Sequence, residues 1–339
     1  MVILKALISL AIAGAGVAVL MHVTMLARAL LVGACHKIAT ILATYLEASL
    51  SSPEFAMELK VLTLNLHTYQ EHHGDLWHVL QEHGREVYLI AEAIVHENVD
   101  VICLQEVGEH FHDHITRPYG FSESNMAFRI QKKIREMSGR HFHLFQDWSH
   151  IGFGCWREGT AILSRYPMHD CVSPWVTWNK DTGHPASRRI TMSYVEIPWF
   201  GWLHIVNAHM NRLESGFKAD FDYLKQLIYQ RGRHQVRGTL LMGDFNVPAG
   251  EEGYQHIVWD GEFIDQWHDS NPRHFYEPTH LERIDGWEHR NEARRIDFIF
   301  KHFRSSLRIN EMRLIFNGHF YPIVSDHFGC LARFDLHPI

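Results

Sequence analysis

Short apolar strands that border polar side chains recur along most of this chain, and this pattern constrains its fold more than any other feature. The polar residues at the ends of these strands are Asn65, Glu106, His209, Asp244, Asn246, Asp297, Asp326 and His327. Amphipathic helical patterns separate the strands, for example over residues 77–97 and around Phe217, Phe221 and Leu224. Strands alternating with helices predict a layered α/β sandwich formed by residues 57–339.

These polar residues are dispersed in the sequence, but the ends of adjacent strands converge in space. A buried carboxylate or amide is costly without a partner, so a shared metal or mutual hydrogen bonds would explain the pattern best. Taken alone, Asn65 is typical of a turn at a strand end, and Glu106 fits a metal ligand or a buried ion pair equally well. The oxygen atoms of Asn65, Glu106, Asp244, Asn246 and Asp326 together suit a hard cation such as Mg²⁺ or Mn²⁺.

Composition disfavours nucleic-acid binding and excludes one type of zinc site. The formal net charge of −7 disfavours a protein whose affinity comes from neutralising nucleic-acid phosphates, although one basic face can exist in an acidic chain. The five cysteines have no paired spacing, which predicts free thiols and excludes a C-x-x-C zinc knuckle. Most of the 28 histidines are expected on the surface, so only a few are candidates for chemistry.

The first 56 residues form a separate segment in this interpretation. Residues 6–34 are apolar apart from a few polar positions such as Arg28, which predicts a membrane anchor, and Ser51-Ser52-Pro53 predicts a linker. Within this segment, Lys5 lies before the uncharged run Ala6–Met21, whereas Arg28 and Lys37 lie after it, which favours a catalytic domain on the cytoplasmic side. The alternative is an appended segment that is not native, because Met57 stands directly before the first strand; the protein would then be soluble and cytoplasmic.

Seven segments resemble, in order, the successive motifs of the endonuclease/exonuclease/phosphatase superfamily. They are Leu62–Asn65, Leu104–Val107, Gly159–Arg165, Asn207–His209, Gly243–Asn246, Arg295–Ile299 and Ser325–His327. The resemblance runs from about Met57 to the C-terminus. It implies an α/β (α+β) fold of the deoxyribonuclease I-like type, which is a four-layer α/β/β/α sandwich. It also implies an enzyme that directs water at a phosphorus ester with the help of a divalent metal.

The resemblance implies a metal site at Glu106 and Asn65, which would hold Mg²⁺ or Mn²⁺. Asp326 would join the ion directly or through a water molecule. A cation held there neutralises the charge that develops on the phosphoryl oxygens and stabilises the leaving oxygen.

The same resemblance implies catalytic roles for five residues. Asp244 would orient or deprotonate the attacking water, and Asn246 would fix its geometry. His327 would donate to a phosphoryl oxygen, and Asp297 would hold its ring and raise its pKa. His209 would be a second phosphate donor. The sequence leaves open which of these groups is formally the acid and which is the base.

A narrower resemblance is to the maltose 6′-phosphate phosphatase group, through Leu66–Glu71, Ile284–Glu288 and Phe316–Gly318. It implies a sugar phosphate as substrate, a choice that the acidic net charge also favours. The expected substrate contacts are Asn211, Asp285 and Trp287. We further expect residues 250–292 to be mostly irregular loops over the site, where aromatic side chains including Trp259, Trp267 and Tyr276 could stack on a sugar.

Three other functions stay open. A phospholipase C or sphingomyelinase-like phosphodiesterase would use the N-terminal apolar segment and the aromatic turn Pro198–Trp202 at a membrane surface. A nuclease ranks third, because the short basic clusters such as Lys132-Lys133 are typical of solvated faces. A non-catalytic membrane scaffold would be expected to lack some of the metal or base residues, and this chain has them all.

Overall fold

The computed structural model describes residues 57–68, 83–111, 121–152, 154–231, 236–282 and 293–337. The chain divides into two units, Met1–Ala56 and Met57–Ile339, and every described residue belongs to the second. The predicted anchor at residues 6–34 and the predicted linker lie outside the described residues, as do Asp285 and Trp287. None of the helices in these ranges combines the length and hydrophobicity that a membrane span requires.

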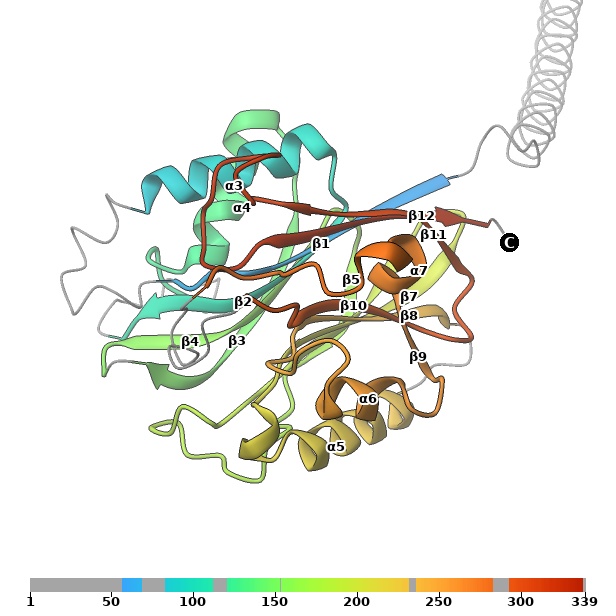
Figure 1. Cartoon of the computed structure of the whole chain (residues 1–339). Helices are drawn as coiled ribbons and strands as arrows, with labels where there is room; N and C mark the ends of the chain where they lie inside the picture. Colours follow the sequence, from blue (N-terminus) through green and yellow to red (C-terminus); the bar gives the residue numbers. More distant parts are fainter. Residues whose placement is uncertain are drawn as a thin grey trace, which may run out of the picture. The chain divides into compact units, whose positions relative to one another are not determined.

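Two six-stranded sheets form the centre of the second unit (Figure 1). The first sheet has the order β11 (Leu307–Ile315), β12 (Gly329–Leu336), β1 (Met57–Asn65), β2 (Val101–His110), β4 (Trp156–Ser164) and β3 (His143–Gly152). The second has the order β5 (Met168–Val172), β6 (Thr191–Ile197), β7 (Gly201–His209), β8 (Val236–Asp244), β10 (Asp297–His302) and β9 (Phe263–Asp265). The middle pair of each sheet, β1 with β2 and β7 with β8, is parallel, and the other pairs are antiparallel.

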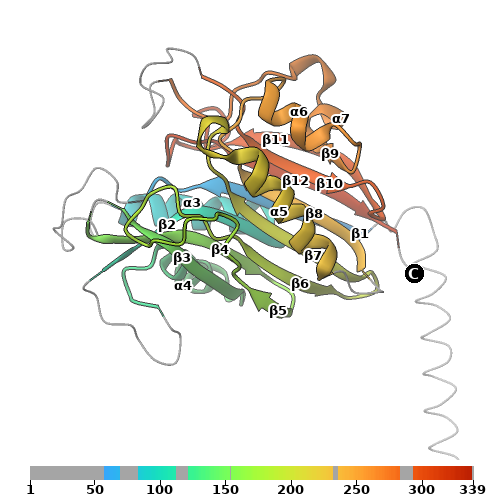
Figure 2. The same cartoon turned by 90° about the horizontal axis from the view of Figure 1, so that it is seen from below.

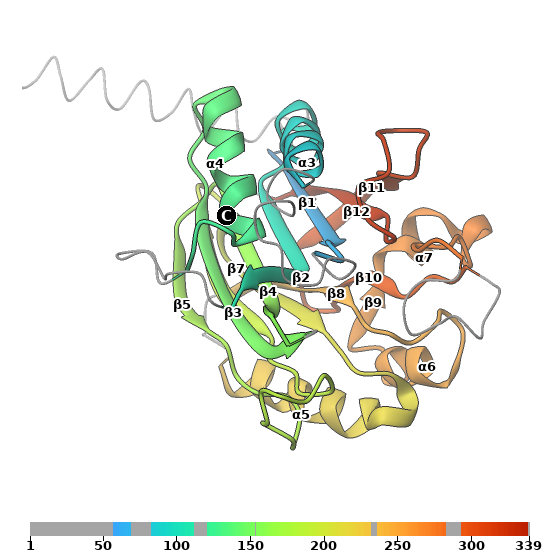
Figure 3. The same cartoon turned by 90° about the vertical axis from the view of Figure 1, so that its left-hand side faces the viewer.

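Helices cover the outer face of each sheet, which gives four layers (Figures 2 and 3). The helices α3 (Gly84–Glu97) and α4 (Met126–Ser138) pack on the first sheet, and α5 (Phe217–Gln230) and α6 (Glu252–Val258) pack on the second. A third apolar cluster fills the space between the sheets. The short elements α7 (Gln266–Ser270), η1 (Leu213–Ser215) and η2 (Pro272–His274) complete the unit. The predicted four-layer α/β/β/α sandwich is confirmed.

The amphipathic patterns explain the two helices that the sequence predicts. In α5, Phe217, Phe221 and Leu224 recur at helical spacing and are fully buried against the second sheet. The helix α3 ends at Glu97 because Asn98 adopts the left-handed conformation, with φ of 57°. The N–H of Asn98 then caps the carbonyl groups of Ile94 and Val95.

Two expectations for the C-terminal third of the chain are wrong. The described part of residues 250–292 contains α6, β9 and α7, and Trp267 packs into the core between the sheets. Helices of five and seven residues contain too few turns to give a clear periodic signal. Asp326 and His327 do not follow a strand as expected, because residues 323–325 are not part of one and the next strand, β12, begins only at Gly329.

Candidate active site

The first sheet supplies Asn65 and Glu106. Asn65 is the last residue of β1, as expected, and pairs with Gln105 of β2. The expectation that Glu106 ends its strand is wrong, because β2 continues to His110. Glu106 lies at an irregularity in the pairing of β2 with β4, and its φ is 49°. A bulge of this kind re-aims a side chain within a continuing strand, which explains how a mid-strand carboxylate reaches the site.

The second sheet aligns three predicted residues through its strand register. His209 at the end of β7 is the register partner of Asp244 at the end of β8. Asp244 is in turn the partner of Asp297 at the start of β10, which runs antiparallel to β8. Three neighbouring strands therefore place a histidine and two aspartates side by side, although 88 positions separate His209 from Asp297 in the sequence.

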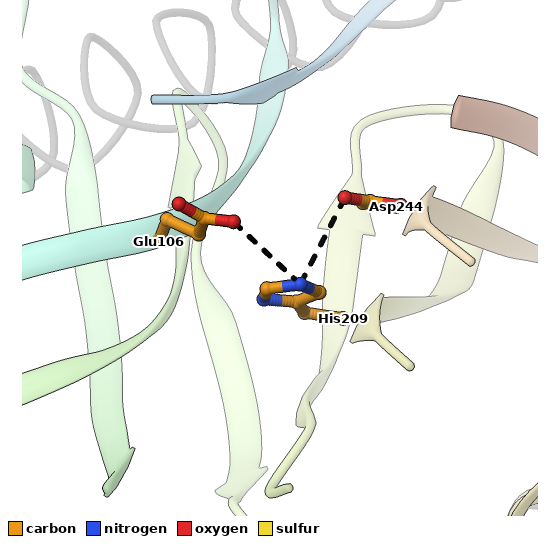
Figure 4. Close-up of side chains that lie close together, drawn as sticks. All are labelled: Glu106, His209 and Asp244. Atoms are coloured by element: carbon orange, nitrogen blue, oxygen red, sulfur yellow. Dashed lines mark ion pairs between the residues drawn. The ribbon is translucent and has the colours of Figure 1, made fainter. Parts of the chain in front are cut away.

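Hydrogen bonds and close polar contacts join these two groups across the sheets. Asn65 Nδ2 donates to Glu106 Oε1 at 2.9 Å and to Asp244 Oδ2 at 3.0 Å. His209 Nε2 lies between the two carboxylates, 3.7 Å from Glu106 Oε1 and 3.8 Å from Asp244 Oδ2 (Figure 4). Glu106, His209 and Asp244 could hold one metal ion, because their ligand atoms all lie within 4.8 Å of one another.

Electrostatics at Glu106 fits a divalent cation. Burial is the largest cause of a Glu106 pKa raised to about 8. The negative charges of Glu158 and Asp326 contribute to the rise, and the charge of His67 opposes it. His67 Nδ1 lies 3.7 Å from Glu106 Oε2 and 3.3 Å from Asp326 Oδ2, so the two predicted ligands face a common point. Crowded carboxylate oxygens are donors that Mg²⁺ and Mn²⁺ prefer. The amide oxygen of Asn65, the other predicted ligand, accepts from the N–H of His67 in this structure.

His327 is oriented by a chain of buried hydrogen bonds. His327 Nδ1 lies 2.9 Å from Asp297 Oδ2, and the hydroxyl of Thr279 donates to the same oxygen at 2.6 Å. Burial acts to lower the pKa of His327, but the charge and hydrogen bond of Asp297, together with the charges of Asp326 and Asp244, outweigh it and raise the pKa well above its ordinary value. The other oxygen of Asp297 is buried and has no hydrogen-bond partner among the described residues. His327 is therefore held as a proton donor that faces Asp244, with Nε2 3.9 Å from Asp244 Oδ2.

Asp244 is held ready to accept a proton. Burial raises its pKa to about 6, and the neighbouring charge of Asp297 contributes. The N–H of Asn246 donates to Asp244 Oδ1 at 2.8 Å, and Asn246 takes a left-handed backbone, with φ of 53°, to do so. Asn246 Nδ2 also lies 3.2 Å from His209 Nε2, which therefore accepts from the amide. Burial, together with the charge of Arg188, lowers the pKa of His209 well below its usual value, so this ring is neutral.

A cavity of about 680 Å³ opens over these groups. Its lining includes Glu106, His209, Asp244, Asn246, Asp326 and His327 from the predicted set, and also Asn211. Asn65 is fully buried beneath it, and Asp297 lies behind His327. Asn211 borders the cavity as expected, but its amide nitrogen already donates to Ala186 O and to Asp220 Oδ2. Within the described residues, every predicted metal and catalytic residue thus belongs to one connected site.

Sequence reasoning missed three neighbours of this site. His67 lies between Glu106 and Asp326, and its position two residues after Asn65 was the available signal. Thr279 supports Asp297 from a distant loop and gave no local signal. Arg188 lines the cavity, and the adjacent arginines Arg188 and Arg189, either of which could contact phosphate, were the available signal.

Comparison with known proteins decides the family. The model of the Endonuclease/Exonuclease/phosphatase family matches residues 78–327. The chain belongs to this family. Members of the endonuclease/exonuclease/phosphatase family are metal-dependent phosphoester hydrolases, so the protein is a metal-dependent phosphoric ester hydrolase. The family resemblance inferred from the motifs is confirmed.

Solved structures of the endonuclease/exonuclease/phosphatase family share the fold. A family protein from Leptotrichia buccalis has 24% identity and a TM-score of 0.68, over 82% of this chain and 100% of that one. A mannosyl-6-phosphatase from Bacteroides thetaiotaomicron has 17% identity and a TM-score of 0.56, over 81% and 99%. An AP endonuclease from Archaeoglobus fulgidus has 15% identity and a TM-score of 0.51, over 81% and 98%. No curated protein matches the chain.

Proposed function

We propose that the protein hydrolyses a small phosphomonoester, a sugar phosphate, with Mg²⁺ or Mn²⁺ as cofactor. The observation that carries this proposal is the cavity of about 680 Å³, whose lining includes the proposed metal ligands Glu106 and Asp326 together with Asp244 and His327. A cavity of this size suits a small ligand, since such sites have volumes of roughly 300–1,000 Å³. The mannosyl-6-phosphatase of similar fold supports a sugar phosphate, as does the resemblance to maltose 6′-phosphate phosphatases.

The residues of the site divide the chemistry between them. Glu106, Asn65 and Asp326 would hold the cation, which supplies charge neutralisation at the phosphoryl oxygens. Asp244 orients water for in-line attack and accepts its proton, for which a pKa of about 6 is well placed near neutral pH. The water oxygen bonds to phosphorus as the ester P–O bond breaks. The leaving sugar oxygen takes up a proton from solvent, and Asp244 returns the proton of the attacking water to solvent. His327, kept protonated by Asp297, donates to a phosphoryl oxygen, and Asn246 keeps Asp244 in place.

A phosphodiesterase that acts at a membrane surface is the second candidate. Trp178 favours it, because this side chain is 97% exposed on the loop that leads to the cavity-lining residues Gly183 and Pro185. The aromatic turn Pro198–Trp202 does not help this candidate as expected. It lies where β7 begins, whereas His209 and the site lie where β7 ends.

We also propose that the protein associates with a membrane through residues 6–34 and that its catalytic unit lies in the cytoplasm. The apolar composition of that segment supports it. Carbonate extraction of membranes from cells that express the full chain tests it. Recovery of the protein in the soluble fraction would count against the anchor.

A parallel assay of four substrates tests the proposed function. The full chain with Mg²⁺ is incubated with mannose 6-phosphate, maltose 6′-phosphate, sphingomyelin and plasmid DNA, and EDTA is the control. We expect release of inorganic phosphate from a sugar phosphate, loss of this activity with EDTA, and a fall of about 10²- to 10⁴-fold in the Asp244→Asn variant. Turnover of sphingomyelin or DNA alone would refute the proposal.

A further inference from the structure

Two adjacent arginines on the cavity side of the second sheet have opposite surroundings. Arg189 forms an ion pair with Asp147 at 2.5 Å, and its guanidinium lies 4.3 Å from the centre of the Trp175 ring. Arg188 lines the cavity, and its side chain has no ion pair or hydrogen bond with any part of the chain that the structure describes. The Nε of each arginine is buried without an acceptor, but only Arg189 has a carboxylate at its terminal nitrogens, so the guanidinium of Arg188 is the unmatched one among the described residues. An unmatched buried donor is costly, so a ligand is the natural partner for Arg188.

The strand register places Arg188 beside the catalytic groups. Thr191 of β6 pairs with Asn207 of β7, and the two strands are antiparallel. The residues just before Thr191 therefore run alongside those just after Asn207, which include His209. Both Arg188 and His209 line the cavity, and the charge of Arg188 adds to the effect of burial that lowers the pKa of His150 on the facing hairpin to about 3.

The loop that carries Arg188, residues 177–189, is fixed from several sides. The backbone N–H of Arg188 donates to Thr177 Oγ1 at 3.0 Å, and Ser187 Oγ donates to Asp181 O at 2.6 Å. Asn211 Nδ2 donates to Ala186 O at 2.9 Å, which ties the loop to the end of β7. Asp220, a carboxylate near Arg188, is hydrogen-bonded to Asn211 and forms no ion pair with the arginine within the described residues. The backbone that carries Arg188 is thus held in place by hydrogen bonds before any ligand arrives.

The charge of the cavity indicates which ligand group this arginine would take. The lining already contains the carboxylates Glu106, Glu158, Asp244 and Asp326. A phosphomonoester brings about two further negative charges at neutral pH, since its second pKa is about 6, whereas a phosphodiester brings only one. We propose that Arg188 binds a non-bridging phosphoryl oxygen and thereby favours phosphomonoesters over phosphodiesters. The inference rests on the proposed function and names the residue that sets this selectivity.

Paired substrates with the same leaving group test this role. The full chain is assayed with Mg²⁺ on p-nitrophenyl phosphate and on bis(p-nitrophenyl) phosphate, as wild type, Arg188→Gln, Arg188→Lys and the matched control Arg189→Gln. A lost charge-assisted hydrogen bond should lower kcat/KM of Arg188→Gln for the monoester by about 10- to 100-fold. For the diester we expect kcat/KM of Arg188→Gln to fall by less than about 3-fold, because its phosphoryl group carries one negative charge fewer for the arginine to neutralise. Arg188→Lys should keep part of the selectivity, and Arg189→Gln all of it.

Inhibition by inorganic phosphate gives a second readout that a purely structural role would not change. Its inhibition constant should rise in Arg188→Gln and not in Arg189→Gln, with similar melting temperatures for both. If wild type prefers the diester, the proposed function fails. If wild type prefers the monoester but Arg188→Gln lowers both activities equally, or neither, the role of Arg188 alone is refuted. Should Arg188→Gln not fold, the selectivity ratio of Arg188→Lys decides, and an unchanged ratio would refute the role.

Discussion

Glu106 and Glu109 are three residues apart on the same strand, yet their surroundings are opposite. Glu109 Oε1 accepts from Arg157 Nη1 at 2.7 Å, and Oε2 accepts from the Ser122 N–H at 3.0 Å and from Asn125 Nδ2 at 3.2 Å. At Glu106, burial and the charges of Glu158 and Asp326 raise the pKa to about 8. One carboxylate is matched by a cation of the chain itself, and the other lies among further carboxylates.

This difference separates a structural use of a buried carboxylate from a functional one. The Glu109 cluster, with Arg157, Ser122 and Asn125, joins β2 and β4 to the start of α4. The Glu106 site stores unfavourable electrostatic energy that a bound divalent cation would relieve. Left-handed backbone at His67, Glu106 and Asn246 adds strain at the same site. The two positions can therefore be distinguished by which property each substitution changes.

The largest effect is expected on activity from Glu106→Gln. The substitution removes a charge that should hold the cation, and metal assistance contributes several kcal/mol to transition-state stabilisation. We expect kcat/KM for a phosphoester to fall by about 10³-fold or more, with a melting temperature in EDTA that is unchanged or higher. Steady-state kinetics with Mg²⁺ measures this. Equal activity of Glu106→Gln and wild type would remove Glu106 from the metal site.

A smaller and different effect is expected from Glu109→Gln. Breaking a buried ion pair leaves Arg157 without its carboxylate and should lower the free energy of unfolding by about 3 kcal/mol. The activity per folded molecule should stay within about 3-fold, because the cluster touches no reacting group. Urea unfolding measures the stability, and Glu123→Gln is the matched control, since its pair with Lys132 is exposed and worth about 0.5 kcal/mol. If Glu109→Gln abolished activity without loss of stability, the distinction between the two positions would be wrong.

The sequence predicted the layers of the fold and the members of the site better than their local geometry. The apolar runs that precede Asn65 and Asp244 and the helical spacing of Phe217 and Phe221 are local signals, and they led to confirmed elements. Glu106 was placed at a strand end because a bulge leaves no mark in an apolar run. Trp267 was assigned to a surface loop, because its burial depends on packing between the two sheets.

Partners that come from distant segments could not be predicted. Thr279 supports Asp297 across 18 positions, and Arg188 differs from Arg189 only in which residues the loop brings near each. Sequence motifs identify the residues proposed to perform the chemistry. The residues that hold those side chains in place depend on how the sheets and loops pack, which no local motif records.

Thermal unfolding of wild type and Glu106→Gln, each in EDTA and in Mg²⁺ at pH 6 and pH 8.5, tests the central claim most directly. The pKa of Glu106 is about 8 in the folded protein and 4.5 in the unfolded chain. Between these pH values the folded state binds more protons than the unfolded state, so the stability of the metal-free protein falls as pH rises. The raised pKa values of Asp244 and His327 act in the same direction and remain in the variant. Mg²⁺ at 100 times its Kd should stabilise wild type by about 2.7 kcal/mol, more clearly at pH 8.5, where no proton competes. Glu106→Gln should show little of this gain and a weaker fall with pH. Equal stabilisation of both proteins by Mg²⁺, or none of wild type, would contradict a metal site at Glu106.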